Sequence, residues 1–134
     1  MAPLRCMALL SVTLMLAACG APEEVAGEAP TADARTERGA FAVAVTPPEG
    51  GFQRGRNSFS VRAIDVRGRP AALRTARARM PAHAHEDSVA TVLPAGDGWR
   101  VEGLVLDMAG RWELSLGFAL EGAEDSALIV LRIP

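Results

Sequence analysis

Apolar residues at every second position are the feature that most limits how this chain can fold. The longest such run is Trp112, Leu114, Leu116, Phe118 and Leu120. Successive side chains of a β-strand point to opposite faces, so this spacing gives one apolar face and one polar face. An amphipathic helix would instead need apolar residues three and four positions apart. The run therefore predicts a half-buried strand.

Further apolar segments lie on both sides of this run. They cover residues 41–45, 59–66, 89–93, 99–106 and 127–133. The alternation changes phase between Val61 and Ile64, which predicts a β-bulge. Along 99–106 it sets Val101, Gly103 and Val105 on one face. Clusters of Gly and Pro separate the segments, as is typical of the short strands of a β-sandwich or barrel.

Residues 71–80, with the sequence AALRTARARM, are compatible with either a helix or a strand. Ala, Leu and Arg favour helices. A helix here would lack a good N-cap after Pro70, and the rest of the domain is β, so we predict a strand. With this strand, residues 39–134 form one all-β domain, a small β-sandwich of about seven strands.

The N-terminus combines one positive charge, Arg5, with an uncharged apolar segment, residues 7–18. This segment is shorter than the roughly 20 apolar residues that a membrane-spanning helix needs. The combination is typical of a secretory signal peptide. The residues that end it, Leu16-Ala17-Ala18-Cys19, resemble the lipobox of bacterial lipoproteins. We predict that residues 1–18 are removed and that Cys19 is lipidated; the alternative is an ordinary signal peptide in which Cys19 lies there by chance.

The lipobox resemblance implies a location as well as a modification. Bacterial lipoproteins carry a diacylglyceryl thioether and usually a further acyl chain, such as palmitate, on this cysteine. Two or more chains anchor a protein stably, whereas one chain binds only marginally. We therefore expect the protein in the cell envelope, attached to a bacterial membrane through Cys19 and facing outside the cytoplasm. Residues 19–38 are acidic and poor in large apolar side chains, which predicts a disordered tether.

Several functional classes are excluded by composition. The only other cysteine, Cys6, lies in the predicted leader, so the mature chain has no thiol pair for a disulfide, thiol redox chemistry or a Cys-rich zinc site. Residues 39–134 hold eleven Arg against eleven Asp plus Glu. Such a near-neutral domain lacks the basic face that nucleic-acid binding requires.

A candidate metal site lies in the segment Met80-Pro81-Ala82-His83-Ala84-His85. In an extended segment the side chains of His83 and His85 point to the same side, and Met80 adds a thioether. A second methionine, Met108, follows the strand at 99–106. If the two segments meet at one end of the sandwich, they form a cysteine-free soft site suited to copper. The alternative is that the histidines are solvated surface and the methionines belong to the core.

Residues 79–116 resemble the YtkA-like and FixH-related extracytoplasmic domains. The resemblance rests on three short patterns: Met80, Pro81, His83 and His85; then Gly98, Trp99, Val101 and Gly103; then Met108, Gly110, Trp112 and Leu114. It implies a small immunoglobulin-like β-sandwich that occurs in lipoproteins or membrane-anchored proteins. Some members are encoded beside genes for copper handling or cytochrome oxidase assembly.

Two functional hypotheses follow. The first is a lipid-anchored binding module that takes copper through Met80, His83, His85 and Met108, as a chaperone or accessory protein. The second is a metal-free structural or interaction module that binds an envelope protein through a sheet edge or through the loop at His83 to His85. We do not expect an enzyme: a Ser88, His83 and Asp87 arrangement can be drawn, but no nucleophile elbow supports it.

Overall fold

The computed structural model describes residues 32–84 and 86–134. The predicted signal peptide, Cys19 and His85 lie outside the described residues. The described part of the chain forms nine β-strands and no helix. It thus contains no helix that is long and apolar enough to cross a bilayer. The strands are Ala32–Arg35 (β1), Ala42–Thr46 (β2), Gly55–Ile64 (β3), Ala72–Arg79 (β4), Ser88–Val89 (β5), Thr91–Ala95 (β6), Gly98–Leu106 (β7), Gly110–Leu120 (β8) and Ala123–Ile133 (β9).

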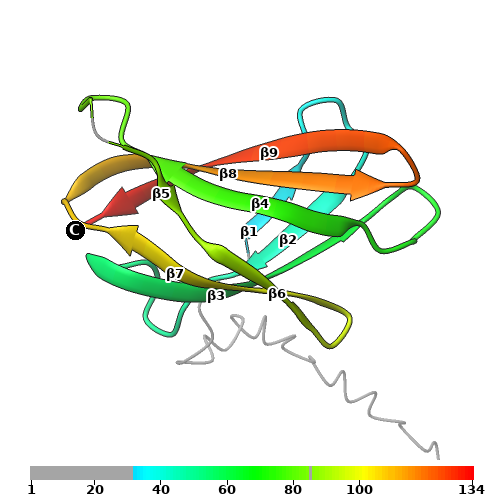
Figure 1. Cartoon of the computed structure of the whole chain (residues 1–134), viewed down its shortest axis with the longest axis horizontal. Coiled ribbons are helices and arrows are strands. Elements are labelled where there is room, and N and C mark those ends of the chain that lie inside the picture. The colour runs from blue at the N-terminus through cyan, green and yellow to red at the C-terminus, as the bar shows by residue number, and fades with distance from the viewer. Residues whose placement is uncertain (1–31, 85) are drawn as a thin grey trace, which may run out of the picture.

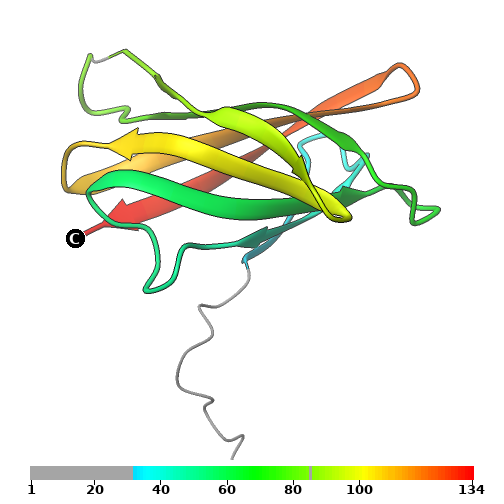
Figure 2. The same cartoon turned by 60° about the horizontal axis from the view of Figure 1, so that its bottom comes forward.

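The strands form two antiparallel sheets that face each other as two layers (Figure 1, and turned in Figure 2). One sheet has the order β1-β2-β3-β7-β6, and the other has the order β5-β4-β8-β9. The buried apolar side chains come from the inner faces of both sheets and form one core cluster. This arrangement confirms the predicted all-β sandwich.

The strand predicted at 112–120 is confirmed as β8, and it lies at the centre of the core. Trp112, Leu114, Leu116 and Phe118 are each at most 3% exposed. The centre of the Phe118 ring lies 6.3 Å from the centre of the ring of Phe41, the residue before β2, so β8 packs directly against the opposite layer. Full burial of one such side chain contributes about 1.5–3 kcal/mol to stability.

The ambiguous segment 71–80 is a strand, β4, as predicted. A register shift between Leu73 and Thr75 adds one residue to β4 relative to β8. Because of this irregularity, alternate residues from Ala76 to Met80 face the core, while the arginines between them face solvent. All the arginine side chains of β4 thus stay in water without loss of the strand's buried face.

The prediction of a β-bulge between Val61 and Ile64 is wrong. Ala63 is 5% exposed and continues the buried alternation, whereas Ile64 is 41% exposed at the end of β3. The error arose because the inward position is filled by alanine and the next, outward position by isoleucine. Hydrophobicity alone therefore assigned the two residues to the wrong faces.

A β-bulge does occur where the first half of β3 pairs with β7. The register shifts between Asn57 and Phe59, and β7 carries the extra residue. Gly103 lies in this bulge with φ of 76°, a conformation that glycine adopts readily. Beyond it Leu104 is 0% exposed and Val105 is 39% exposed, which reverses the predicted faces of these two residues.

The sandwich begins earlier than the predicted boundary at residue 39. β1 pairs with β2 in a register that runs from Ala32 opposite Val45 to Arg35 opposite Ala42. The segment predicted as a tether, residues 19–38, therefore overlaps the domain. Its composition did not reveal this strand, because backbone pairing holds β1 and, among residues 33–35, only the small Ala34 side chain packs against the core.

The predicted strand at 89–93 is divided between the two sheets. β5 pairs with β4, and β6 pairs with β7. The chain passes from one sheet to the other at Ala90, whose N–H donates to the Ala76 carbonyl at 2.9 Å. This division, together with β1, explains why nine strands are observed where about seven were predicted.

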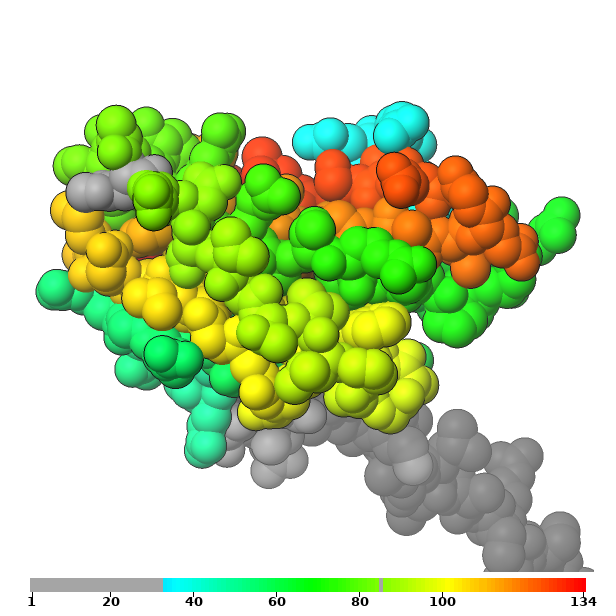
Figure 3. All heavy atoms as spheres, viewed as in Figure 1, coloured from blue at the N-terminus to red at the C-terminus, as the bar shows by residue number. Residues whose placement is uncertain are grey.

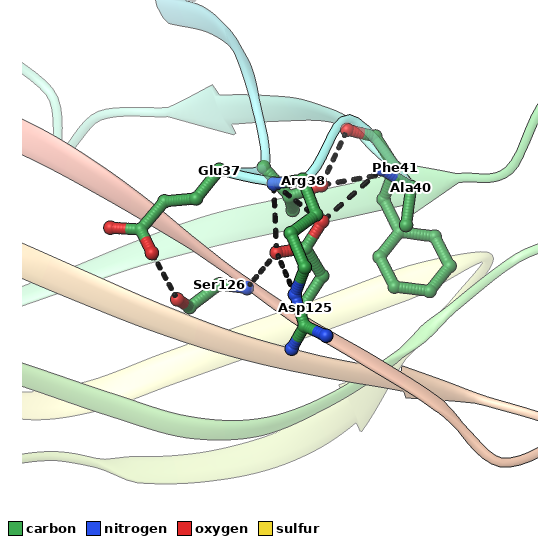
Figure 4. A network of polar contacts seen from close by, with 7 residues as sticks. Glu37, Arg38, Ala40, Phe41, Asp125 and Ser126 are labelled. Carbon is green, nitrogen blue, oxygen red and sulfur yellow. Dashed lines mark hydrogen bonds and ion pairs between the residues drawn. The ribbon is translucent and has the colours of Figure 1, made fainter.

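Asp125 of β9 is a buried carboxylate that holds the turn between β1 and β2 (Figure 4). It accepts backbone N–H groups from Arg38 at 3.1 and 3.2 Å, from Ala40 at 3.1 Å and from Ser126 at 2.9 Å. Burial alone would raise the pKa of Asp125. Hydrogen bonds from the Thr36 side chain and these N–H groups outweigh burial and lower the pKa from 3.8 to about 2.

Candidate metal centre

Met80 follows the last residue of β4 and points into the core, where it is 5% exposed. A side-chain carbon placed on Gly110 would lie 3.2 Å from the Cε atom of Met80. The end of the Met80 side chain therefore packs against the start of β8. Gly110 has φ of 127°, which is a second reason for glycine at this position.

Met108 lies in the turn between β7 and β8, where it is half-buried and packed against the core. Its carbonyl accepts the indole N–H of Trp112 at 3.0 Å. Trp112 is itself buried, so this hydrogen bond fixes the turn to the rigid part of the sandwich. The four-residue spacing of Met108 and Trp112 thus has a structural role in this turn.

The segments that contain Met80 and Met108 come together at one end of the sandwich. The register of β4 with β8 sets Ala78 opposite Leu114 and Arg79 opposite Glu113, so the end of β4 lies beside the beginning of β8. The space-filling view shows the β4–β5 loop in green and the β7–β8 turn in gold at this same end (Figure 3). The segments that contain Met80 and Met108 therefore meet at one end of the sandwich, as the predicted site requires.

His83 lies in the exposed loop between β4 and β5. Its backbone N–H donates to the Met80 carbonyl at 3.1 Å, which closes a turn directly after β4. The loop that bears the histidines is therefore tied to the residue that carries the first thioether. His85 lies outside the described residues. The structure thus brings Met80, Met108 and the His83 backbone to one end and does not place the fourth candidate ligand.

Three charged residues beside this end, Arg79, Arg111 and Glu113, are paired with one another. Glu113 accepts hydrogen bonds from Arg79 at 3.0 and 3.1 Å and from Arg111 at 3.1 Å. The hydrogen bond from Arg79 is the main reason that the pKa of Glu113 is lowered, against the opposing effect of burial. Glu113 stays ionised, faces away from the core and is occupied by two guanidinium groups, so it does not complement the candidate site.

Other potential ligands and catalytic groups nearby have structural contacts. The Ser88 hydroxyl accepts the Val105 N–H at 2.9 Å, and a carboxylate oxygen of Asp87 lies 4.0 Å from Arg77. These contacts hold β5 beside its neighbours. Within residues 32–84 and 86–134, no group of three or more His, Cys, Asp or Glu side chains could hold a metal ion.

The sequence analysis named Gly110 and Trp112 but did not predict their contacts with the two methionines. It placed Trp112 in the core but did not foresee that the indole N–H would bind the Met108 carbonyl. The available signal was the pattern Met-x-Gly-x-Trp, since an indole N–H that begins a buried strand needs an acceptor from the preceding turn.

Comparison of the chain with family models, curated proteins and solved structures found no match.

Proposed function

We propose that this chain is a lipid-anchored binding module of the bacterial cell envelope that holds Cu(I) at the β4/β8 end of the sandwich. The observation that carries the proposal is the contact of the Met80 side chain with Gly110, two residues after Met108. It joins two segments that are distant in sequence and that each contain a thioether. The resemblance to YtkA-like domains supports the same reading.

The ligand types favour copper over harder ions. Thioether sulfur selects Cu(I), whereas imidazole also suits zinc, nickel and iron. Met80 would be the inner ligand, because its side chain is buried, and the imidazoles of His83 and His85 would supply the remaining ligands. A site without cysteine is chemically suited to an oxidising compartment, where a thiolate is easily oxidised. As a chaperone or accessory protein, such a module would carry or present the ion to an envelope partner.

Cu(I) titration against a competing chelator tests this proposal. We expect Met80→Leu and Met108→Leu each to weaken Cu(I) binding about tenfold or more, since even the outer-shell partners of metal ligands change affinity by 10–100-fold. Leucine is the appropriate replacement because it nearly conserves the volume of methionine and removes the sulfur. The double variant His83→Ala, His85→Ala should weaken Cu(I) binding as well.

A zinc titration of the same variants provides the control. The methionine variants should leave any Zn²⁺ affinity unchanged, because thioether contributes little to zinc, while the histidine variant should reduce it. Equal Cu(I) affinity for the unaltered chain and all three variants would refute the copper site. The metal-free interaction module, which binds an envelope protein, would then be the better reading.

Lipid attachment is tested at Cys19. We expect Cys19→Ser to abolish incorporation of radiolabelled palmitate and to leave the leader uncleaved by the lipoprotein peptidase. Without acyl chains the protein should no longer be held by its lipid in the membrane fraction, because anchoring depends on two or more chains. Mass spectrometry that finds an unmodified mature N-terminus on the unaltered protein would contradict the prediction.

A further inference from the structure

Within the part of the chain that the structure describes, four strands form the edges of the two sheets, and only one of them, β9, is both long and open. An exposed edge presents unpaired N–H and C=O groups to any other strand, and natural sheets protect against this with short strands, proline or bulges. β1 has four residues, β5 has two, and β6 contains Pro94. β9 has eleven residues and pairs with β8 without any register shift.

The open part of the β9 edge is limited to residues 128–132. The Ser126 carbonyl accepts the Glu37 N–H at 2.8 Å, so this carbonyl points away from β8 and the turn after β1 covers the edge there. In a regular strand the N–H and C=O groups of alternate residues point the same way. Those of Leu128, Val130 and Arg132 therefore also point outward, and within the described residues no other backbone group bonds to them.

The side chains of the same three residues are exposed on the outer face of the sheet. Leu128 is 48% exposed and Val130 is 45% exposed. Arg132 lies opposite Arg111 in the register of β9 with β8, and Arg111 is already bound to Glu113. Within the described part of the chain Arg132 has no ion-pair partner. The open edge thus combines two apolar side chains with one uncompensated positive charge.

A complementary charge lies at the far end of the same edge. The Glu37 carboxylate is 3.5 Å from the Ser126 hydroxyl (Figure 4), and the Glu37 N–H donates to the Ser126 carbonyl, so Glu37 lies at the edge position opposite Ser126. In a strand paired antiparallel with residues 128–132 of β9, the residue opposite Leu128 would lie beside Glu37. If that strand is β9 of another copy, the residue is Arg132.

We propose that β9 is a homodimer interface, in which two copies pair antiparallel about a two-fold axis at Val130. The pairing sets Leu128 opposite Arg132 of the second copy and Val130 opposite Val130. It satisfies the outward N–H and C=O groups of all three residues on both copies. It also brings Arg132 of each copy beside Glu37 of the other, so two ion pairs form. The two four-stranded sheets become one continuous sheet.

Self-complementarity favours a second copy over the strand of another protein as the occupant. A two-fold interface uses the same surface on both partners, so every feature must meet its counterpart. Here Val130 of one copy meets Val130 of the other at the centre, and Arg132 of each copy meets Glu37 of the other. Moving the axis to Leu128 would set Val130 of the second copy opposite Ser126, where Glu37 already bonds, so that register is excluded. With the axis at Val130 only Pro134 of the second copy reaches this position, and Pro134 lies beyond the end of β9 and has no N–H.

Disulfide trapping in the full chain, expressed in a bacterial envelope, tests the interface. Opposed residues in a hydrogen-bonded antiparallel pair have Cα atoms about 5.5 Å apart, within the range that a disulfide bridges. Val130→Cys should therefore give a covalent dimer on mild thiol oxidation. Leu128→Cys is the matched control, since the two copies of residue 128 would be about 13 Å apart along the strands. The unaltered chain measures the background from Cys6 and Cys19.

Charge reversal in the Val130→Cys background identifies the ion pairs. We expect Arg132→Glu to reduce the trapped dimer strongly, and Glu37→Arg to do the same, because each places like charges together. The double variant Arg132→Glu, Glu37→Arg should restore trapping. Equal trapping at positions 128 and 130 would indicate random collision and overturn the proposal. Absence of trapping at position 130 in a chain with an unchanged melting temperature would overturn it as well.

Discussion

Trp112→Ala should lower the free energy of unfolding by about 3–5 kcal/mol, the cost typical of removing a large buried aromatic side chain. Trp112 is 3% exposed at the start of the central strand β8, so truncation leaves a cavity that the two facing sheets cannot close. Small domains have a total stability of roughly 5–15 kcal/mol, so this loss is a large fraction of it. Equilibrium unfolding in guanidinium chloride, followed by circular dichroism, measures the change.

Two control variants separate the contributions to this effect. Trp112→Phe keeps most of the buried volume but removes the N–H that binds the Met108 carbonyl. It should cost less than Trp112→Ala, and the difference isolates packing from the hydrogen bond. Trp99 is only partly buried, so Trp99→Ala should cost less than Trp112→Ala. Equal losses for Trp99→Ala and Trp112→Ala would contradict the central position of Trp112.

The strands that the sequence predicted well are those in which every inward position carries a large apolar residue. In β8 the signal from Trp112 to Phe118 is uninterrupted, and the observed faces match it. β4 was identified as a strand although six of its eight residues are alanine or arginine, because the surrounding pattern was β. Its register shift at Leu73 was not foreseen, since nothing in a run of small and charged residues marks an added residue.

Two of the predictions failed where backbone geometry, not side-chain character, determines the structure. Gly103 was treated as an ordinary member of an alternating strand, but its positive φ creates the bulge that exchanges the faces of Leu104 and Val105. β1 was assigned to the tether because its side chains bury little surface. Its stability comes from hydrogen bonds to β2, which a composition argument does not count.

For the candidate site, the sequence named residue types and the fold supplied their proximity. The pairing of β4 with β8 brings Met80 beside the turn that holds Met108, which depends on a register between strands more than thirty positions apart. No spacing within the sequence encodes that register. The burial of Met80 could not be predicted from the local sequence pattern either, because it depends on the register shift between Leu73 and Thr75 earlier in β4.

Asp125→Ala should destabilise the domain more than any substitution of an exposed carboxylate. The side chain of Asp125 is 2% exposed, and its oxygens receive the N–H groups of Arg38, Ala40 and Ser126. Alanine removes the acceptors and leaves these donors without a partner in a site with little water, which costs more than the lost bonds themselves. Asp97→Ala is the matched control: its side chain is 74% exposed and paired only with Arg62 at the surface.

The same carboxylate gives a pH signature that separates charge from shape. The pKa of Asp125 in the folded protein is about 2, below the ordinary value of 3.8, so the folded state binds its proton less readily than the unfolded state. Its stabilising contribution is therefore fully present above about pH 4 and is lost as the pH falls toward 2.

Asp125→Asn keeps the shape and one acceptor oxygen but cannot titrate. Its unfolding midpoint should thus lie below that of the unaltered chain at pH 6, and the difference should shrink as the pH falls from 4 to 2. A difference that stays constant over this interval would show that the ionised carboxylate does not hold the β1–β2 turn against β9.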